Sequence, residues 1–244
     1  MTGFDRRWFV IGAGALALGG CNAAQPDTQI TAAIPTKRGR KGVATTLGDP
    51  DAMALAPDGA SYQALYGNVG GEPFPVPALR NGVIGPAYWR RDVVFPSNET
   101  PGTIVVDPRR HYLYHVKGIG QARRYGVGVG RQGFAWSGVA EIRSKQEWPD
   151  WYPPKEMVER QPELQRQVSQ LRSGLGVAGG PRNPLGARAM YLWQGNQDTL
   201  FRIHGTTDPG SIGRSVSSGC IRMANQDAID LYASVAVGSR VVVI

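Results

Sequence analysis

The 244-residue sequence has few of the side chains on which metal sites depend. It contains only two cysteines, Cys21 and Cys220, and three histidines, His111, His115 and His204. No group of these residues has zinc-site spacing. His111 and His115 lie four residues apart, on one side of a predicted strand, and have no third ligand nearby in the sequence. We therefore predict no metal site.

Long apolar runs are also missing. The apolar stretch Trp8–Gly20 has thirteen residues, too few to span a bilayer comfortably. It follows the charged segment Met1–Arg7 and precedes small residues, which is the layout of a cleaved export signal. Arg6-Arg7-x-Phe9-Val10 is similar to a twin-arginine signal. Leu18-Gly19-Gly20-Cys21 is similar to a lipobox, in which Cys21 would be acylated; ordinary cleavage nearby is the alternative.

Export would make the small number of cysteines informative about function. If Cys21 is acylated or removed, Cys220 is the only thiol in an oxidising compartment. An unpaired thiol is a liability there unless it is used, so we expect Cys220 to be functional. The alternative is a buried cysteine that acts as a small apolar side chain. We predict an exported, periplasmic protein, anchored to a membrane only if Cys21 carries lipid.

The sequence has no run of basic residues interleaved with aromatic ones, so nucleic acid is not an expected partner. The formal net charge is nevertheless +8, and it stays at +7 without residues 1–20, which hold Arg6, Arg7 and Asp5. A basic surface suits an anionic polymer. In the compartment predicted above, carboxylate-rich peptidoglycan fits that description.

Composition and length predict one loop-rich β domain with an extension. Glycine (33) and proline (18) are abundant, which favours β structure over a helical bundle. We expect an export signal over residues 1–21, a flexible tether and N-terminal extension over residues 22–100, and the ordered domain over residues 101–244. Within the extension, Ala52–Asn68 favours a short helix. The sequence does not decide whether Tyr88–Phe95 packs against the ordered domain.

Local patterns place strands and helices within the ordered domain. β-branched runs separated by turn residues predict strands: Thr103–Asp107, His111–Val116, Tyr125–Gly130, Ala187–Leu192, Leu200–His204 and Arg240–Ile244. Apolar spacing predicts a helix over Lys155–Arg172, which Pro162 can break in two, followed by a loop over Gly174–Gly186. A last helix is expected over Gln226–Val235, capped by Asn225.

One segment carries the chemistry. His204-Gly205-Thr206 precedes Ser217-Ser218-Gly219-Cys220-Ile221-Arg222, with sixteen residues from the histidine to the cysteine. A thiol attacks a carbonyl as the thiolate, so it needs a base or a positive neighbour. His204 can supply the base, the backbone N–H of Gly219 can hold an oxyanion, and Arg222 adds a permanent positive charge.

These residues resemble the L,D-transpeptidase (YkuD-like) catalytic domain of bacterial cell-wall enzymes. Met223 and the Asn225-x-Asp227 tail are similar to the ErfK/YbiS/YcfS/YnhG-type branch. The resemblance runs from Gly102 to Ile244. The chain departs from many members at Ser218, where they have histidine, and at Phe134–Gly138, where they have a Thr-Pro-x-Gly run.

The resemblance implies a fold and a reaction. The fold is mainly β, a β-sandwich or barrel-like domain with a helical cap insertion over residues 144–186 and a C-terminal helix. Cys220 is the nucleophile, His204 the general base and acid, and the Gly205 carbonyl orients the imidazole. The substrates are peptide stems of peptidoglycan, no cofactor is needed, and the expected substrate-binding residues are Arg222, Ser218, Thr206 and Trp151.

Several alternatives stay open. Transfer can form 3→3 cross-links between stems or join a stem to an outer-membrane protein. The same scaffold can act as an L,D-carboxypeptidase or amidase-type hydrolase by admitting water. A non-catalytic wall-anchoring module is a further alternative, against which the presence of both His204 and Cys220 argues. A papain-like peptidase does not fit, because its cysteine precedes its histidine.

Overall fold

The computed structural model describes residues 61–131, 137–217 and 219–244. All of them belong to one compact unit, Ala44–Ile244. The predicted export signal, the lipidation site at Cys21, most of Phe134–Gly138 and the candidate substrate-binding residue Ser218 lie outside the described residues. Within the part of the chain that is described, no helix has both the length and the apolar character to cross a membrane.

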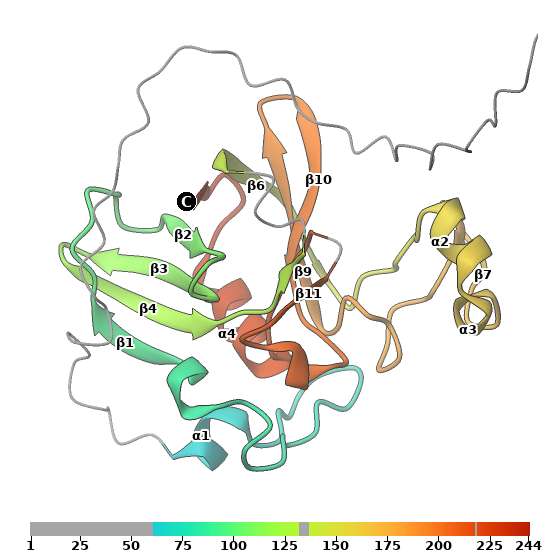
Figure 1. The fold of residues 1–244 in the computed structure, drawn as a ribbon, viewed down its shortest axis with the longest axis horizontal. Coiled ribbons are helices and arrows are strands. Elements are labelled where there is room, and N and C mark those ends of the chain that lie inside the picture. The colour runs from blue at the N-terminus through green and yellow to red at the C-terminus, as the bar shows by residue number, and fades with distance from the viewer. Residues whose placement is uncertain (1–60, 132–136, 218) are drawn as a thin grey trace, which may run out of the picture. The chain divides into compact units, whose positions relative to one another are not determined.

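A nine-stranded mixed sheet forms the body of the domain (Figure 1), in the strand order β1-β4-β3-β2-β13-β6-β9-β10-β12. Two pairs are parallel, β2 with β13 and β10 with β12, and the other neighbours are antiparallel. The strands of this sheet are β1 Arg91–Val94, β2 Ile104–Asp107, β3 Tyr112–Gly118, β4 Gln121–Gly126, β6 Gly138–Glu147, β9 Arg188–Gln194, β10 Gln197–His204, β12 Ile221–Arg222 and β13 Arg240–Val243.

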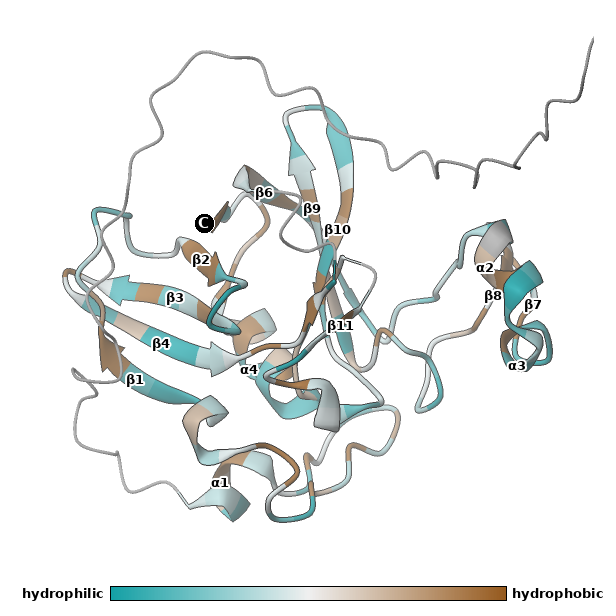
Figure 2. Cartoon of the chain, in the orientation of Figure 1, coloured by the Kyte–Doolittle hydropathy of each residue, from teal (hydrophilic) through white to brown (hydrophobic). Residues whose placement is uncertain are grey.

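The sheet follows from the patterns of its strands. Every residue of β2 is buried, as its Ile-Val-Val run demands. Strand β3 has apolar segments separated by more polar ones (Figure 2), and its first five residues are all buried, so both of its faces pack against other residues. The largest apolar core joins β2, β3, β6, β9 and β13 to the C-terminal helix. The prediction of a mainly β domain with a C-terminal helix is confirmed.

That helix, α4, spans Asn225–Ser234. Asn225 is its first residue and not its cap, because Ala224 holds the N-cap position and no side chain caps the helix. The Asn225 side chain instead accepts a hydrogen bond from the N–H of Ala187, at 3.0 Å. The predicted cap is therefore wrong, and the amide of Asn225 joins α4 to the start of β9.

The predicted helix over Lys155–Arg172 is only partly right. Two short helices, α2 (Lys155–Arg160) and α3 (Pro162–Gln165), lie on either side of the break that Pro162 introduces. The chain then forms a hairpin of β7 (Ser169–Leu171) and β8 (Gly174–Gly176) within the predicted helix end and loop. Two backbone hydrogen bonds between Trp151 and Val177, of 2.9 and 2.8 Å, close the base of this segment.

Residues 61–100, within the predicted tether and extension, pack against the domain through α4 and the edge of the sheet. Helix α1 (Tyr62–Tyr66) begins at Ser61, whose hydroxyl accepts from the N–H of Ala64. A 3₁₀ turn, η1 (Pro86–Tyr88), leads to β1, which pairs along its length with β4. The segment Tyr88–Phe95, which the sequence left undecided, thus packs against the domain. The remaining short elements are η2 (Pro209–Ser211), β5 (Val129–Gly130) and β11 (Ser215–Ser217).

Candidate active site

Cys220 lies in a tight turn between β11 and β12. Gly219, directly before it, has a φ of +128°, a conformation that glycine adopts without strain. The hydroxyl of Ser217 donates to the carbonyl of Cys220 at 2.7 Å and accepts from the N–H of Gly219 at 3.4 Å. Ser217 therefore holds the turn through its backbone.

His204 reaches the same place from the end of β10. Because β10 and β12 are parallel and pair His204 with Arg222, the segment that carries Cys220 runs directly beside the histidine strand. The imidazole is 4% exposed. Its Nδ1 lies 2.5 Å from the carbonyl oxygen of Gly205. A carbonyl can only accept, so Nδ1 carries the proton and Nε2 of the neutral ring has a free lone pair.

The environment keeps this imidazole neutral. Burial lowers the pKa of His204 to about 4, although contacts with the carbonyls of Gly205 and Leu185 favour the charged form. The positive charges of Arg222 and Arg202 lower the pKa further. At neutral pH His204 is thus uncharged and able to accept a proton.

The thiol of Cys220 is free and half-buried. Burial raises its pKa above the ordinary value, while a backbone contact with Arg202 and the charges of Arg202 and Arg222 act in the opposite direction. At neutral pH the thiol of Cys220 and the imidazole of His204 are therefore both uncharged. The positive charges of Arg202 and Arg222 favour the thiolate form of the cysteine.

Arg202 is a site residue that the motif did not reveal. Its guanidinium donates to both carboxylate oxygens of Asp198, at 2.7 and 2.8 Å, which fixes it over β10. It precedes His204 by two residues in a strand, so both side chains lie on the same face. That alternation is the sequence signal that could have identified Arg202.

The predicted substrate-binding residues have different surroundings. Arg222 is half-buried, and its backbone pairs with Gly128 at 2.7 and 2.9 Å. Among the ion pairs that the structure gives for its described residues, none involves the Arg222 guanidinium. Thr206 is buried, and its hydroxyl accepts from the N–H of Asp208 at 3.0 Å. Trp151 is half-buried at the base of the α2–β8 segment.

The other two histidines and Trp148 have contacts of their own. Nε2 of His111 is 2.9 Å from the hydroxyl of Ser215, and His115 is buried in β3. Trp148 is buried against Phe74, with 5.0 Å between ring centroids, so it fixes the N-terminal extension to the domain.

Comparison with known proteins agrees with the motif. The model of the L,D-transpeptidase catalytic domain (YkuD) matches residues 101–243. The protein named probable L,D-transpeptidase ErfK/SrfK of Escherichia coli strain K12 is 30% identical over 160 residues, which cover 63% of this chain and 47% of that protein. The chain thus spans about half the length of the curated relatives it matches.

Two solved structures are also similar. One from Brucella melitensis, named a probable carnitine operon oxidoreductase caia, is 50% identical and covers 67% of this chain and 99% of that one, with a TM-score of 0.44. An L,D-transpeptidase from Mycobacterium smegmatis is 17% identical and covers 63% of this chain and 66% of that one, with a TM-score of 0.43. The family model covers more than half of the chain and includes both His204 and Cys220, so the chain belongs to the L,D-transpeptidase (YkuD) catalytic domain family of cysteine-nucleophile enzymes.

Proposed function

We propose that the protein is a peptidoglycan L,D-transpeptidase in which Cys220 and His204 carry out acyl transfer. The observation that supports this most is the state of His204. Its Nδ1–H is fixed on the carbonyl of Gly205, and its pKa of about 4 leaves Nε2 free to accept a proton at neutral pH. A neutral, oriented imidazole beside a protonated thiol is the arrangement that general-base activation of a nucleophile needs.

The reaction proceeds in two halves. The sulfur of Cys220 forms a bond to the amide carbonyl carbon of a peptide stem as its proton passes to Nε2 of His204. The C–N bond then breaks, His204 returns that proton to the departing amine of the C-terminal D-amino acid, and a thioester remains. An amine of a second stem attacks the thioester carbonyl, and a new C–N bond forms as the C–S bond breaks. The proton of the amine passes through His204 to sulfur, which restores the free thiol.

Backbone and arginine groups stabilise the charge that develops. The N–H groups of Gly219 and Cys220 are the proposed oxyanion donors. The hydrogen bond from the Gly219 N–H to the Ser217 hydroxyl is long, 3.4 Å, so the carbonyl oxygen of a substrate can readily replace that hydroxyl as the acceptor. The guanidinium of Arg222 is proposed to bind a carboxylate of the stem, while Arg202 lowers the energy of the thiolate as it forms.

The acceptor is proposed to be a stem amine, which would form a 3→3 cross-link. Thr206, Ser218 and Trp151 are proposed to contact substrate around the cysteine turn, and residues 144–186 to act as a cap insertion. An exported protein with a lipid on Cys21 would hold this site beside the wall. The alternative products, protein-bound stems or shortened stems released by water, use the same first half-reaction.

Mass spectrometry of the products tests the reaction. Purified protein is incubated with tetrapeptide-stem fragments, with the Cys220→Ala variant as control. Cross-linked dimers are expected from the wild type and none from the variant; tripeptides without dimers would instead show hydrolysis. If a carbapenem fails to acylate the wild type while the Cys220→Ala variant still binds sacculi, the protein is a wall-anchoring module.

Analysis of wall composition identifies the acceptor. Muropeptides from a deletion strain are compared with those of its parent. Loss of 3→3 dimers is expected if the acceptor is a stem amine. Loss of protein-bound muropeptides, with dimers unchanged, would assign the enzyme to protein attachment.

A further inference from the structure

A buried ion pair connects the N-terminal extension to the start of β9. The carboxylate of Glu72 accepts from Nη2 and Nη1 of Arg188 at 2.6 and 2.9 Å, and from the indole N–H of Trp148 at 2.8 Å. The two ionic side chains are 9% and 8% exposed. Hydrogen bonds from Arg188 hold the pKa of Glu72 below its usual range, so the carboxylate is charged.

Arg188 is in turn bound to the backbone that carries His204. Its carbonyl oxygen accepts from the N–H of Gly205 at 2.9 Å. Its Nη1 also donates to the carbonyl of Ala187 at 2.8 Å. The carbonyl of Gly205, on the other side of the same residue, accepts from Nδ1 of His204. Two residues therefore separate the Glu72 carboxylate from the catalytic imidazole.

A second contact restrains Gly205 from the side of α4. The amide oxygen of Asn225 accepts from the N–H of Ala187 at 3.0 Å. A Cβ atom on Gly205 would lie 2.2 Å from that oxygen and 3.1 Å from the nitrogen of Ala187. The peptide of Gly205 is thus enclosed between Asn225 and the first residues of β9, and it cannot shift without moving one of them.

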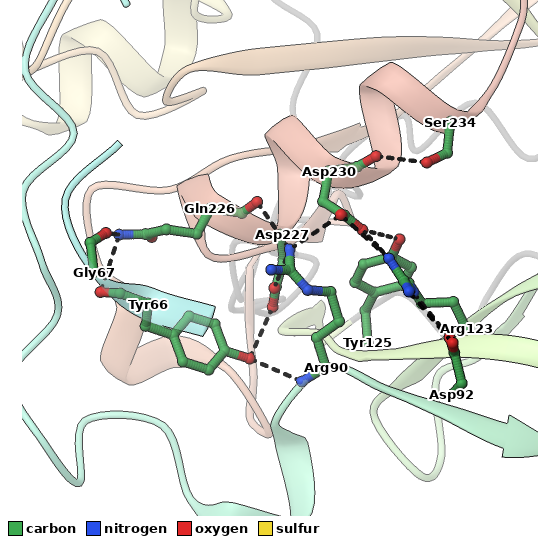
Figure 3. A network of polar contacts seen from close by, with 10 residues as sticks. All are labelled: Tyr66, Gly67, Arg90, Asp92, Arg123, Tyr125, Gln226, Asp227, Asp230 and Ser234. Carbon is green, nitrogen blue, oxygen red and sulfur yellow. Dashed lines mark hydrogen bonds and ion pairs between the residues drawn. The ribbon is translucent and has the colours of Figure 1, made fainter. Parts of the chain in front are cut away.

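The extension also holds the helix that carries Asn225 (Figure 3). The hydroxyl of Tyr66 donates to Asp227 at 3.2 Å and accepts from the backbone N–H of Arg90 at 2.9 Å. The side-chain amide of Gln226 donates to the carbonyls of Gly67 and Pro77, at 3.2 and 3.0 Å. Both supports of Gly205 are therefore anchored in residues 61–95.

We propose that this part of the extension is a positioning element of the active site, and that Glu72 is a positioning residue for His204. Glu72 acts through Arg188 and Gly205, and it does not touch the reacting atoms. The proposal rests on the function proposed above, since it concerns the orientation of its general base. It predicts that removing the charge of Glu72 lowers the rate of the chemical step more than the affinity for substrate.

The physical reason is the unpaired charge that the change would create. Without the carboxylate, the buried guanidinium of Arg188 has lost its anion and must move toward water or toward other acceptors. A movement that is transmitted to the backbone of Arg188 shifts the carbonyl that holds the N–H of Gly205. An imidazole misplaced by about an ångström loses on the order of a hundredfold in rate, so a smaller shift still has a measurable effect.

The test compares two matched variants. Glu72→Gln removes a buried charge at nearly constant shape. Glu99→Gln removes a charge from the same extension at an ion pair with Arg240, 3.1 Å long, whose side chains are 19% and 48% exposed. The rate of Cys220 acylation by a carbapenem is measured with its saturation curve, together with the melting temperature of each variant. We expect a loss of about tenfold or more in the maximal rate for Glu72→Gln and less than about twofold for Glu99→Gln.

A signal independent of activity separates this proposal from the proposed function. The Nδ1–H proton of His204, assigned by its absence in His204→Gln, is expected to change its NMR shift in Glu72→Gln and not in Glu99→Gln. An unchanged signal and an unchanged rate in folded Glu72→Gln overturn the positioning role. If wild-type protein shows the signal but no acylation, the proposed function is wrong, and the effect of Glu72 on the signal still decides the positioning role. Arg188→Lys, which keeps the positive charge but loses the paired Nη1 and Nη2 contacts with Glu72, replaces Glu72→Gln if that variant does not fold, and the same two outcomes apply to it.

Discussion

The surroundings of His204 and Cys220 shift both pKa values so that the neutral forms are favoured. Burial lowers the pKa of the imidazole to about 4 and raises that of the thiol. A thiolate–imidazolium pair would place two charges in a poorly hydrated site before substrate arrives. In the reaction proposed above, the charges form only as the substrate carbonyl is attacked, when Arg202, Arg222 and the N–H groups of the turn could stabilise them.

The pH dependence of acylation should report this state. Because the pKa of free His204 is about 4 and not 6.5, its base form persists as pH falls to about 5. We expect the second-order rate of Cys220 acylation by a carbapenem to stay level between about pH 5 and 8 and to fall only near pH 4. A solvated histidine would already lose about tenfold one unit below its ordinary pKa.

Circular dichroism at each pH provides the control, since unfolding would also reduce the rate. The His204→Gln variant should be slow throughout the range. A rate that halves near pH 6.5 in folded wild-type protein would contradict the neutral, buried imidazole.

The candidate reacting residues belong to one sequence motif, but the residues that support them do not. His204, Gly205 and Cys220 belong to one motif, and the structure places the Gly205 carbonyl on the imidazole. Glu72 is 132 positions before His204, and its contact with Arg188 depends on the path of an extension without a motif. Such a pair is set by tertiary packing, which local patterns do not encode.

At the scale of elements, the cysteine turn depends on the small sheet formed by β5 and β11. These strands pair in parallel, with Gly130 opposite Ser217. A Cβ atom on Gly130 would lie 2.2 Å from the nitrogen of Gly219 and 2.9 Å from the carbonyl oxygen of Ser217. Both contacts are with backbone, so an alanine could fit only if the turn moved.

We expect Gly130→Ala to lower the rate of Cys220 acylation by about tenfold to a hundredfold, because the nucleophile moves with its turn. Gly118→Ala is the matched control, since a Cβ at that strand position has no atom within 4 Å. Stopped-flow measurement of carbapenem acylation compares the two. Equal rates in both variants would show that the turn tolerates displacement.

The prediction of elements succeeded where one local signal dominates. β-branched runs placed β2, β3 and β13 near their observed bounds. It failed between Ser169 and Gly176, where a helix end and then a loop were predicted and the chain forms a hairpin with Gly174 at a φ of +129°. After Pro162 only a short helical stretch remained, and a short helix is weakly stable by itself. Pairing with β8 therefore prevailed.

At the scale of the whole molecule, three buried groups make stability depend on pH with opposite signs. Burial lowers the pKa of His115, like that of His204, to about 4. Burial raises the pKa of Asp227 to about 7, against the charge of Arg90 and the hydrogen bond from Tyr66. His115 is also surrounded by the charges of Lys117 and Arg123, which lower its pKa, and by Asp230, which raises it.

The signs follow from proton binding. Between about pH 6.5 and 4 the unfolded chain protonates its histidines and the folded chain does not, so their contribution to stability is lost as pH falls. Asp227 is protonated when folded and ionised when unfolded between pH 3.8 and about 7. Its contribution is present at low pH and is lost as pH rises. The free energy of unfolding of the wild type should thus change less with pH than either kind of group alone would cause.

Two variants separate the contributions, and each serves as the control for the other. The free energy of unfolding is measured with urea at about pH 5 and about pH 8. His115→Gln should make the increase in this free energy between the two pH values smaller by on the order of 2 kcal/mol, and Asp227→Asn should make it larger by a similar amount. Asparagine keeps an acceptor for the Tyr66 hydroxyl while removing the titrating group. Because the two changes have opposite signs, a general loss of stability cannot produce both. If the free energy of unfolding changes with pH in both variants as it does in the wild type, these groups are hydrated in the folded protein. The extension would then be bound to α4 less tightly than its contacts indicate.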